Sequence, residues 1–379
     1  MKSLHEHLSL ADTKRILSLD GGGIRGALSL GILKNIEDML KERFKDVIPP
    51  DSFRLHHYYD LIGGTSTGAI IAAALAIGMS VDEITQKYKE LGSDIFQKGG
   101  WLDKIHDLWK SKYDVKPLRK HLDQFFKDIK MGDDDIKTGL TIVAKRLDSF
   151  STWPLTNNPK AKYFERNNFY VKDYVRASAA APTYFIPEVL KDISTQKEYL
   201  FVDGGFSLMN NPSLQLFMIA TFKGYNLHWK TGKDHLMITS IGTGRRPRNL
   251  NLDKYKNPNN LQLAQIVADV FMSDSTEFIE TMMQSMSTSL TARVIDREIG
   301  DLKDDLIGGH EQFTYNRFNV FFDVDQVKAL GFDFNDDQLD TLSEMDNAAN
   351  TNDLIAIGLA AGKKEVKPEH FPAAFDLKP

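Results

Sequence analysis

Short runs of apolar residues alternate along the chain with longer stretches in which apolar residues recur every three or four positions. The short runs predict strands buried on both faces, and the longer stretches predict helices. The predicted strands lie at 15–19, 58–63, 139–145, 200–202, 236–241 and 318–322. The predicted helices lie at 27–41, 69–78, 81–91, 173–181, 212–222, 261–290 and 339–362. This alternation favours an α/β fold, with a mostly parallel sheet covered by helices on both faces.

The same pattern divides the chain into regions. Residues 1–14 are polar and predict a flexible leader, whereas residues 15–245 carry the regular alternation and predict one core. The core is interrupted at about 99–135 by aromatic and charged residues, which we interpret as a helical insert and a candidate lid. Residues 246–379 predict a helical extension packed on the core. The proline-containing stretch 153–159 is interpreted as a loop.

Composition and charge narrow the class of protein. The chain has 379 residues, a net charge of -5 and no cysteine. Without a global basic field, binding to a nucleic-acid polymer is not expected, and the lack of cysteine fits a reducing compartment. No apolar run reaches the roughly 20 residues of a membrane span, and the first residues show no signal-peptide pattern. These features favour a cytoplasmic protein that would contact a membrane only through a local surface patch.

The first candidate motif is Gly64-Thr65-Ser66-Thr67-Gly68, between the predicted strand 58–63 and the predicted helix 69–78. A serine between two glycines on a sharp strand-to-helix turn is the nucleophile elbow of serine hydrolases. Such a turn exposes the serine hydroxyl at the head of a sheet. By itself the pattern is equally typical of a glycine-rich turn with a helix-capping serine, so the role of Ser66 depends on the other motifs.

The second motif, Asp20-Gly21-Gly22-Gly23-Ile24-Arg25-Gly26, joins the first predicted strand to the helix that follows it. Its glycines also satisfy the Gly-x-Gly-x-x-Gly pattern of dinucleotide-binding folds. That pattern expects an acidic residue about 20 positions on, at the end of the next strand. Here residues 43–47 form a polar helix end, and the next strand ends at Ser66. The missing acidic residue counts against a dinucleotide-binding loop. A dinucleotide-dependent oxidoreductase nevertheless stays open as an alternative.

The same loop suits stabilisation of an oxyanion. Consecutive glycines at a helix N-terminus expose several backbone N–H groups, and the helix dipole adds positive potential there. Such donors stabilise the charge that develops on a carbonyl oxygen under attack. Arg25 adds a cation that suits the oxyanion or a substrate phosphate. The steric need for glycine in a tight turn explains one or two of the glycines more readily than three in a row.

A serine nucleophile needs a base, which is usually histidine. None of the 10 histidines follows a predicted strand convincingly: His56 and His57 precede the elbow strand, and His310 lies in a polar loop. Asp203 directly ends the strand 200–202 and is followed by two glycines. Because the carboxyl ends of parallel strands meet at one edge, we expect Asp203 to reach the Ser66 hydroxyl and take its proton. A turn-forming Asp-Gly is the alternative role.

Taken in chain order, the glycine loop at 20–26, the elbow at 64–68 and Asp203-Gly204-Gly205 resemble the patatin-like phospholipase family. The stretch 177–185 before the aspartate strand, the stretch 210–212 after it and the stretch 240–244 agree with the same family. The resemblance covers residues 15–244 clearly and the C-terminal helices loosely. It implies a three-layer α/β fold and a lipid acyl hydrolase with a Ser–Asp dyad, in which Ser66 is the nucleophile and Asp203 the base.

The resemblance also implies the remaining parts of the site. Gly21, Gly22 and Gly23 would supply the oxyanion donors and Arg25 would assist them. No metal and no other cofactor would enter the chemical step. A catalytically dead lipid-binding protein of the same fold is the alternative within the family.

A finer resemblance involves the stretches 143–148 and 153–159. They are similar to bacterial patatin-like phospholipases that act in antiphage defence and are switched on by cyclic nucleotides. A strand with a charged end followed by a proline-rich loop is the plain structural explanation of these residues. The partners expected from the resemblance are membrane phospholipid, the inner face of the membrane as a transient contact, a cyclic-nucleotide activator and a second copy of the chain.

Overall fold

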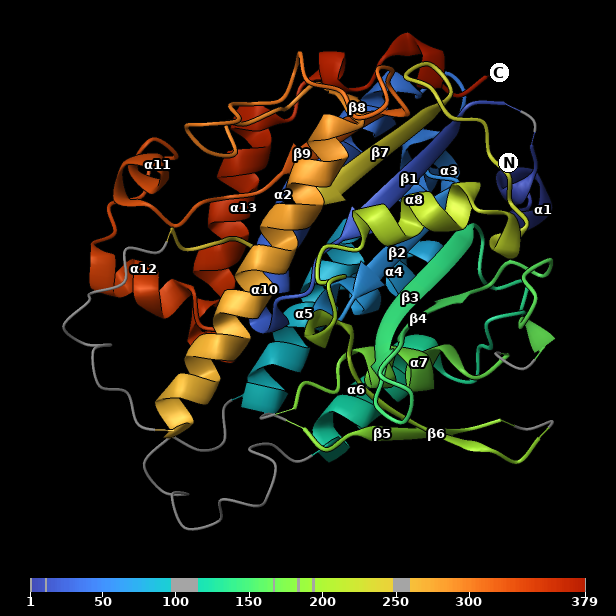
Figure 1. Cartoon of the computed structure of the whole chain (residues 1–379), viewed down its shortest axis with the longest axis horizontal. Helices are drawn as coiled ribbons and strands as arrows, with labels where there is room; N and C mark the ends of the chain where they lie inside the picture. The colour runs from blue at the N-terminus through green and yellow to red at the C-terminus, as the bar shows by residue number, and fades with distance from the viewer. Residues whose placement is uncertain are drawn as a thin grey trace.

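A nine-stranded mixed sheet forms the centre of the computed structural model, which describes residues 2–10, 12–96, 115–165, 168–182, 185–192, 195–247 and 260–378 (Figure 1). The strands are β1 (Lys14–Leu19), β2 (Leu61–Thr65), β3 (Gly139–Arg146), β4 (Thr152–Thr156), β5 (Glu188–Lys191), β6 (Glu198–Asp203), β7 (Leu236–Ile241), β8 (Ser287–Ser289) and β9 (Phe313–Phe318). Their order is β5-β6-β3-β2-β1-β7-β9-β8, and β4 pairs with β3 beside this path. From β3 to β8 the strands are parallel, whereas the pairs β3–β4, β3–β6 and β5–β6 are antiparallel. The predicted mostly parallel sheet is confirmed.

Helices cover both faces of this sheet. One face carries α2 (Gly26–Arg43), α3 (Leu55–Tyr58), α4 (Thr67–Ala76), α5 (Val81–Phe96), α6 (Val115–Phe126), α7 (Val171–Ser178), α11 (Val324–Lys328), α12 (Asp336–Leu342) and α13 (Thr351–Glu365). The other face carries α1 (Leu4–Leu8), α8 (Ser213–Thr221) and α10 (Asn260–Ser285). Successive residues of β1 point into the two separate cores, Leu17 into the first and Ile16 into the second. Every residue of α4 is buried, as its uniformly apolar sequence predicts.

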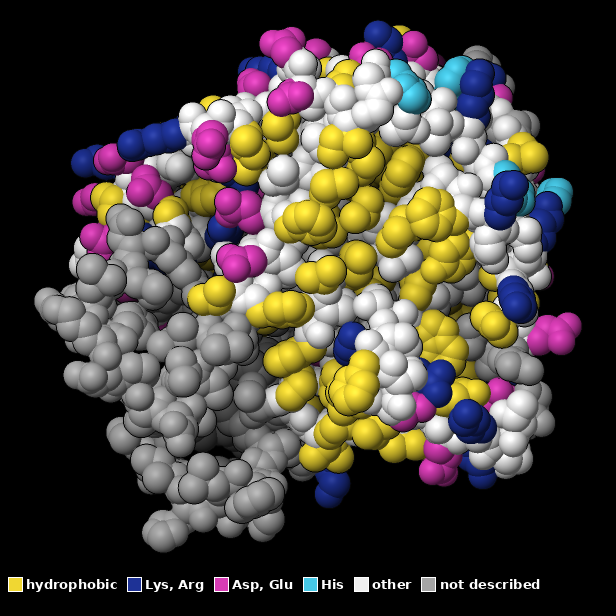
Figure 2. Space-filling model, viewed as in Figure 1, with side chains coloured by type: hydrophobic (Ala, Val, Ile, Leu, Met, Phe, Trp, Pro, Cys, Tyr) yellow, Lys and Arg dark blue, Asp and Glu magenta, His cyan; other side chains and the backbone are white. Residues whose placement is uncertain are grey.

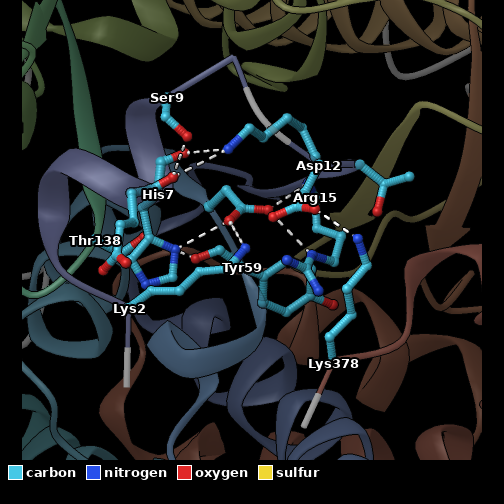
Figure 3. A network of polar contacts seen from close by, with 12 residues as sticks. Lys2, His7, Ser9, Asp12, Arg15, Tyr59, Thr138 and Lys378 are labelled. Atoms are coloured by element: carbon cyan, nitrogen blue, oxygen red, sulfur yellow. Dashed lines mark hydrogen bonds and ion pairs between the residues drawn. The ribbon is translucent and has the colours of Figure 1, made fainter.

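Within residues 1–14, where a flexible leader was expected, Leu4–Leu8 form α1 and Lys14 begins β1. His7 Nδ1 and Lys2 Nζ lie 3.0 and 3.3 Å from one oxygen of the buried Asp60 carboxylate. Arg15 donates from its backbone N and its Nε to the other oxygen, both at 3.0 Å (Figure 3). The partner of these polar side chains lies some fifty residues along the chain, so periodicity does not reveal it. The capping box that starts α1 at Ser3 was the available local signal.

The Asp60 carboxylate is ionised in this cluster. Burial alone would raise the pKa of Asp60, but Arg15, His7 and Lys2 outweigh burial and hold that pKa well below its usual range. Burial lowers the pKa of His7, so its imidazole is neutral and binds Asp60 by hydrogen bonding rather than as a full charge.

We expect His7→Ala to lower the free energy of unfolding by about 1–2 kcal/mol, because a buried carboxylate loses a hydrogen-bond partner. Hydrogen exchange of the amides of α1 should speed up together with this loss. His5→Ala, on the exposed side of the same helix, is the matched control and should change neither quantity. Equal exchange rates for the two variants would show that His7 does not hold α1 in place.

The C-terminal region does more than pack helices on the core. Its strands β8 and β9 extend the sheet next to β7, so the sheet continues across the expected boundary at 245. The predicted strand at 318–322 is displaced from the observed β9, because β9 buries polar residues that the apolar pattern passes over: Thr314, Asn316 and Arg317. The helix α13 packs closely along α2 at Gly31 of α2 and Gly358 of α13. A Cβ on Gly358 would lie 2.2 Å from the Leu28 carbonyl oxygen.

Two further expectations concern the region after β2. The insert predicted at about 99–135 lies partly outside the described residues, and its described part contains α6. The stretch 153–159 is not only a loop, because Thr152–Thr156 form β4 and Pro154 pairs with Val143 of β3. Among the helices of the described residues, none has both the length and the apolarity to cross a bilayer.

Candidate active site

Ser66 occupies a strained turn between β2 and α4. Its backbone has φ 55° and ψ -122°, a conformation that non-glycine residues rarely adopt. A Cβ on Gly64 would lie 2.1 Å from the Gly68 carbonyl oxygen, and one on Gly68 would lie 2.2 Å from the Leu19 carbonyl oxygen. Both flanking glycines are therefore required by close backbone approach. Ser66 stands at the N-cap position of α4, yet its side chain makes no capping hydrogen bond, so the simple capping interpretation does not describe it.

Asp203 ends β6 and lies beside Ser66. Its carboxylate accepts a hydrogen bond from the Gly205 amide at 2.7 Å, and the Ser66 hydroxyl lies close enough to lower its pKa. Burial raises the pKa of Asp203 to about 6, against the opposing effects of Ser66, Gly205 and the nearby Arg176. The groups that shift this pKa include no histidine, and His56 and His57 lie in α3, before β2 begins.

The expected route of Asp203 to the site is wrong. We expected parallel strand ends to meet, but β6 is antiparallel to β3, with Asp203 opposite Ala144 and Phe201 opposite Arg146. The strand β6 therefore enters from beyond the carboxyl end of β3 and ends level with the elbow. An apolar run followed by Asp-Gly-Gly marks a strand end but carries no information on strand direction.

The glycine loop lies directly beside the elbow. A Cβ on Gly21 would lie 3.2 Å from the Ser66 Cβ. The Gly21 amide donates to the Asn210 carbonyl oxygen at 3.0 Å, and the amide of Ile24 donates to that of Met345 at 2.8 Å. The amides of Gly22 and Gly23 donate no hydrogen bond to any acceptor among the described residues. These two amides are the donors that the glycine loop leaves available.

Arg25 lies at the start of α2 with its guanidinium turned toward the C-terminal region. Its Nη1 donates to the Ser343 carbonyl oxygen, at the end of α12, at 3.2 Å. It thereby ties the glycine loop to a carbonyl at a helix C-terminus, where a cation is favourable. The sequence suggested Arg25 as a cation for the oxyanion or a substrate phosphate, and the structure shows that it also binds the C-terminal end of α12.

A buried ion pair holds the beginning of the loop. Asp20 accepts two hydrogen bonds from Arg317 of β9, at 2.9 and 2.6 Å, and both side chains are buried. Arg317 also donates to Ser240 Oγ of β7 at 2.8 Å. Burial raises the pKa of Asp20 while Arg317 opposes this shift. Nothing in the local sequence identifies Arg317, because its partner lies almost three hundred residues away.

Ser178 is a second residue that sequence reasoning missed. Its Oγ accepts the hydrogen bond of the Ser66 amide at 2.8 Å and donates to the Val143 carbonyl oxygen at 2.6 Å. Ser178 ends α7 and so links the elbow to β3. It falls within the stretch 177–185 that resembles the family, but only the structure shows what its hydroxyl does. Within the described residues, no group of three His, Asp or Glu side chains is arranged to hold a metal ion.

We expect Ser178→Ala to lower kcat for ester hydrolysis about ten-fold with little change in KM, because the elbow amide and a strand carbonyl lose their partner. The same variant should lose about 1–3 kcal/mol of folding free energy. Ser178→Thr keeps the hydroxyl and should recover part of kcat. A Ser178→Ala enzyme with full kcat would show that the elbow does not depend on this bridge.

Comparison with known proteins agrees with this geometry. The chain is 31% identical over 232 residues to a "cGAMP-activated phospholipase" of Escherichia coli (strain TW11681), and the match covers 60% of this chain and 62% of that protein. It is 31% identical over 261 residues to "Patatin-17" of Solanum cardiophyllum, with 62% and 61% covered. A "cUMP-AMP-activated phospholipase" of Escherichia coli is 30% identical over 244 residues, with 62% and 65% covered. The chain thus matches less than two thirds of the length of each of these relatives.

A solved structure and a family profile complete the comparison. The crystal structure of VipD from Legionella pneumophila aligns with 92% of this chain and 67% of that chain at 13% identity, but its TM-score of 0.34 is too low to support an argument. Residues 17–217 match the sequence profile described as "Patatin-like phospholipase". This match covers more than half of the chain and includes Ser66, Asp203 and the glycine loop. The chain belongs to the patatin-like phospholipase family.

Proposed function

We propose that this protein is a lipid acyl hydrolase that cleaves carboxyl esters of membrane glycerophospholipids. The observation that carries the proposal is the strained turn that presents Ser66 beside the buried Asp203 carboxylate, whose pKa the Ser66 hydroxyl lowers, next to a loop of glycine amides. A carboxyl group with a pKa of about 6 is mostly ionised at neutral pH and is more basic than an exposed aspartate. The names of the similar phospholipases support an ester of a phospholipid as the substrate.

The proposed reaction proceeds through an acyl-serine. Asp203 accepts the hydroxyl proton as Ser66 Oγ bonds to the acyl carbonyl carbon, and the carbonyl electrons move to oxygen. The amides of Gly22 and Gly23 hold this oxyanion, and Gly21 joins them if its amide leaves Asn210. The ester bond then breaks, and the proton on Asp203 goes to the departing alcohol. Asp203 next takes a proton from water as the water oxygen attacks the acyl-serine; when the second tetrahedral intermediate collapses, the bond to Ser66 Oγ breaks, that oxygen takes the proton from Asp203, and the fatty acid is released.

The test measures fatty-acid release from phospholipid vesicles, together with labelling of Ser66 by a fluorophosphonate. We expect Ser66→Ala to lose both signals, with the rate reduced at least about 10³-fold. Ser52→Ala, at an exposed serine away from the elbow, is the matched control and should retain both. A folded Ser66→Ala protein with near-wild-type release would contradict the dyad. A wild-type protein without label or release would instead favour the catalytically dead alternative, and tight binding of NAD or NADP would favour the oxidoreductase.

We propose further that a cyclic nucleotide activates the enzyme. Two similar proteins are named for activation by cGAMP and cUMP-AMP. By analogy, the enzyme would act in the cytoplasm, contact the inner face of the membrane when active, work as a homo-oligomer and serve antiphage defence. Hydrolysis rates with and without a panel of cyclic di- and trinucleotides test the regulation. The proposal fails if none of these nucleotides binds the protein or changes the rate.

A further inference from the structure

We propose that the turn between β3 and β4, with the neighbouring edge strand β5, inserts into the headgroup region of a phospholipid bilayer. We call this the hairpin surface and define it by residues 145–152 together with Ile186 and Val189. The inference rests on the proposed function, because it names the part of the molecule that would bring the Ser66 edge to a lipid substrate.

The hairpin surface protrudes from the edge of the sheet at which the nucleophile lies. Thr65 of β2 pairs with Val143 of β3, so Ser66 is level with the next residue of β3. The parallel strand β3 then continues to Arg146 before the chain turns, at about 3.3 Å per residue. The strand β6 pairs with this outer end of β3, and β5 pairs with β6, so β5 lies at the same end. Figure 1 shows the turn and β5 together at the lower margin of the molecule.

Exposed apolar side chains mark this surface. Phe150, at the turn, is 80% exposed, and Ile186 and Val189 are 55% and 51% exposed. Phe150 also has φ 51°, an uncommon backbone conformation for a bulky residue. The Lys145 Nζ, which donates to the Phe150 carbonyl oxygen at 2.6 Å, stabilises this turn. The fold thus holds a phenyl ring out in solvent in a conformation that costs free energy, as functional segments do.

Cationic and hydroxyl side chains surround the apolar ones. Arg146 lies over the rings of Trp153 and Tyr199, 4.8 and 4.2 Å from their centroids, and forms an ion pair with Asp148. That pair neutralises the single carboxylate within 145–152, a segment that also contains Lys145 and several hydroxyl groups. Lys191 and Lys197 are exposed on β5 and just before β6. Figure 2 shows apolar side chains bordered by Lys and Arg, with a few acidic groups, at this margin.

This chemistry fits a bilayer better than a fixed protein partner. Aromatic and aliphatic side chains enter the boundary between headgroups and acyl chains, while lysines and hydroxyls contact phosphates. A stable protein complex buries about 800 Å² on each partner around an apolar centre. Three exposed apolar side chains separated by charged groups do not supply such a centre. A membrane needs no complementary shape, and a protruding ring is enough to enter it.

The test compares two asparagine substitutions at exposed phenylalanines. Phe150→Asn removes the ring and keeps a residue that tolerates positive φ, so the turn is preserved. Phe222→Asn is the matched control, because Phe222 is 54% exposed past the far end of α8, the helix that begins next to the glycine loop. In a Ser66→Ala background, sedimentation with phosphatidylcholine–phosphatidylglycerol vesicles measures binding. We expect Phe150→Asn to weaken binding at least about ten-fold, Phe150→Trp to retain it and Phe222→Asn to leave it unchanged.

Hydrolysis separates this inference from the proposed function. With Ser66 intact, Phe150→Asn should lower the ratio of vesicle hydrolysis to soluble short-chain ester hydrolysis about ten-fold. Unchanged vesicle binding of Phe150→Asn, or equal losses in the two asparagine variants, overturns the hairpin surface even if the enzyme is active. Conversion of a dimer to a monomer by Phe150→Asn without loss of vesicle binding also overturns it, in favour of a second copy as occupant. Vesicle binding that depends on Phe150 in a wild-type chain that cleaves neither ester supports the surface and rejects the proposed function.

Discussion

Asp203→Asn is expected to abolish ester hydrolysis and, at the same time, to stabilise the folded protein at neutral pH. Asparagine retains an oxygen that accepts the Gly205 amide but does not take up a proton from Ser66. The rate should therefore fall at least about 10³-fold. Wild-type kcat/KM should rise with pH through about 6 and then level off, because the proposed base is active only when ionised. Fatty-acid release from vesicles across this pH range is the measurement.

The stability effect follows from the same carboxyl group. Burial raises the pKa of folded Asp203 from 3.8 to about 6, so the folded state binds the proton of this carboxyl group more tightly than the unfolded state does. The contribution of Asp203 to stability is complete below about pH 4 and is lost as pH rises through about 6. A difference of about two pKa units corresponds to at most ~3 kcal/mol. Asparagine does not ionise, so the variant should gain on the wild type by up to this amount above pH 7.

Urea unfolding at pH 4 and pH 8 checks this expectation. The difference in unfolding free energy between Asp203→Asn and wild type should grow in favour of the variant from the lower to the higher pH. Ser66→Ala is the matched control, since it also removes activity but retains the buried carboxyl group. A variant advantage that is equal at both pH values would show that Asp203 is not the group that titrates.

Arg317→Met is expected to destabilise the fold by about 3–5 kcal/mol and to disorder the glycine loop. The substitution leaves Asp20 buried next to the loop without its cation, and an uncompensated buried charge is among the costliest changes in a protein. The melting temperature and fluorophosphonate labelling of Ser66 should fall together. The exposed Arg297→Met is the matched control and should leave both near the wild-type values.

A double variant separates the ion pair from the packing of the arginine stem. Asp20→Asn combined with Arg317→Met removes both charges, so it should regain most of the lost stability. If the double variant is as unstable as the sum of the two single variants, the two side chains do not interact energetically. In that case Arg317 would support β9 by packing rather than by holding Asp20.

Local sequence predicted most of the architecture. The apolar runs 15–19 and 236–241 form strands whose residues are all buried, as their sequences predict. The alternation of strands and helices likewise predicted the α/β fold. The predictions were wrong where folding buries polar groups or pairs distant ones. The strand β9 contains the buried Arg317, and α1 is held to the core by the contact of His7 with Asp60, so an apolar pattern predicts neither element.

The candidate site divides in the same way. The structure brings Gly21 of the glycine loop and Asp203 close to Ser66 of the elbow, although the strand that carries Asp203 runs in the direction opposite to the expected one. The direction of β6 and the bridge through Ser178 were not expected, because strand direction and hydroxyl partners depend on chain segments far apart in sequence. The hydrogen bond of the Gly21 amide to Asn210 is a further example, since a glycine run shows which amides exist but not which are occupied.

The sequence by itself determined the family and the fold class, and it predicted the residues around which we propose a serine hydrolase site. These are local properties: glycine where backbones meet, apolar runs where strands are buried, and an aspartate at a strand end. Only the tertiary structure decided that Asp203 lies in a buried position that raises its pKa to about 6. It also decided that Arg317 pairs with Asp20 at the start of the loop and that Phe150 is exposed at the turn between β3 and β4. Burial, charge pairing and exposure depend on all surrounding segments at once, so no single stretch of sequence specifies them.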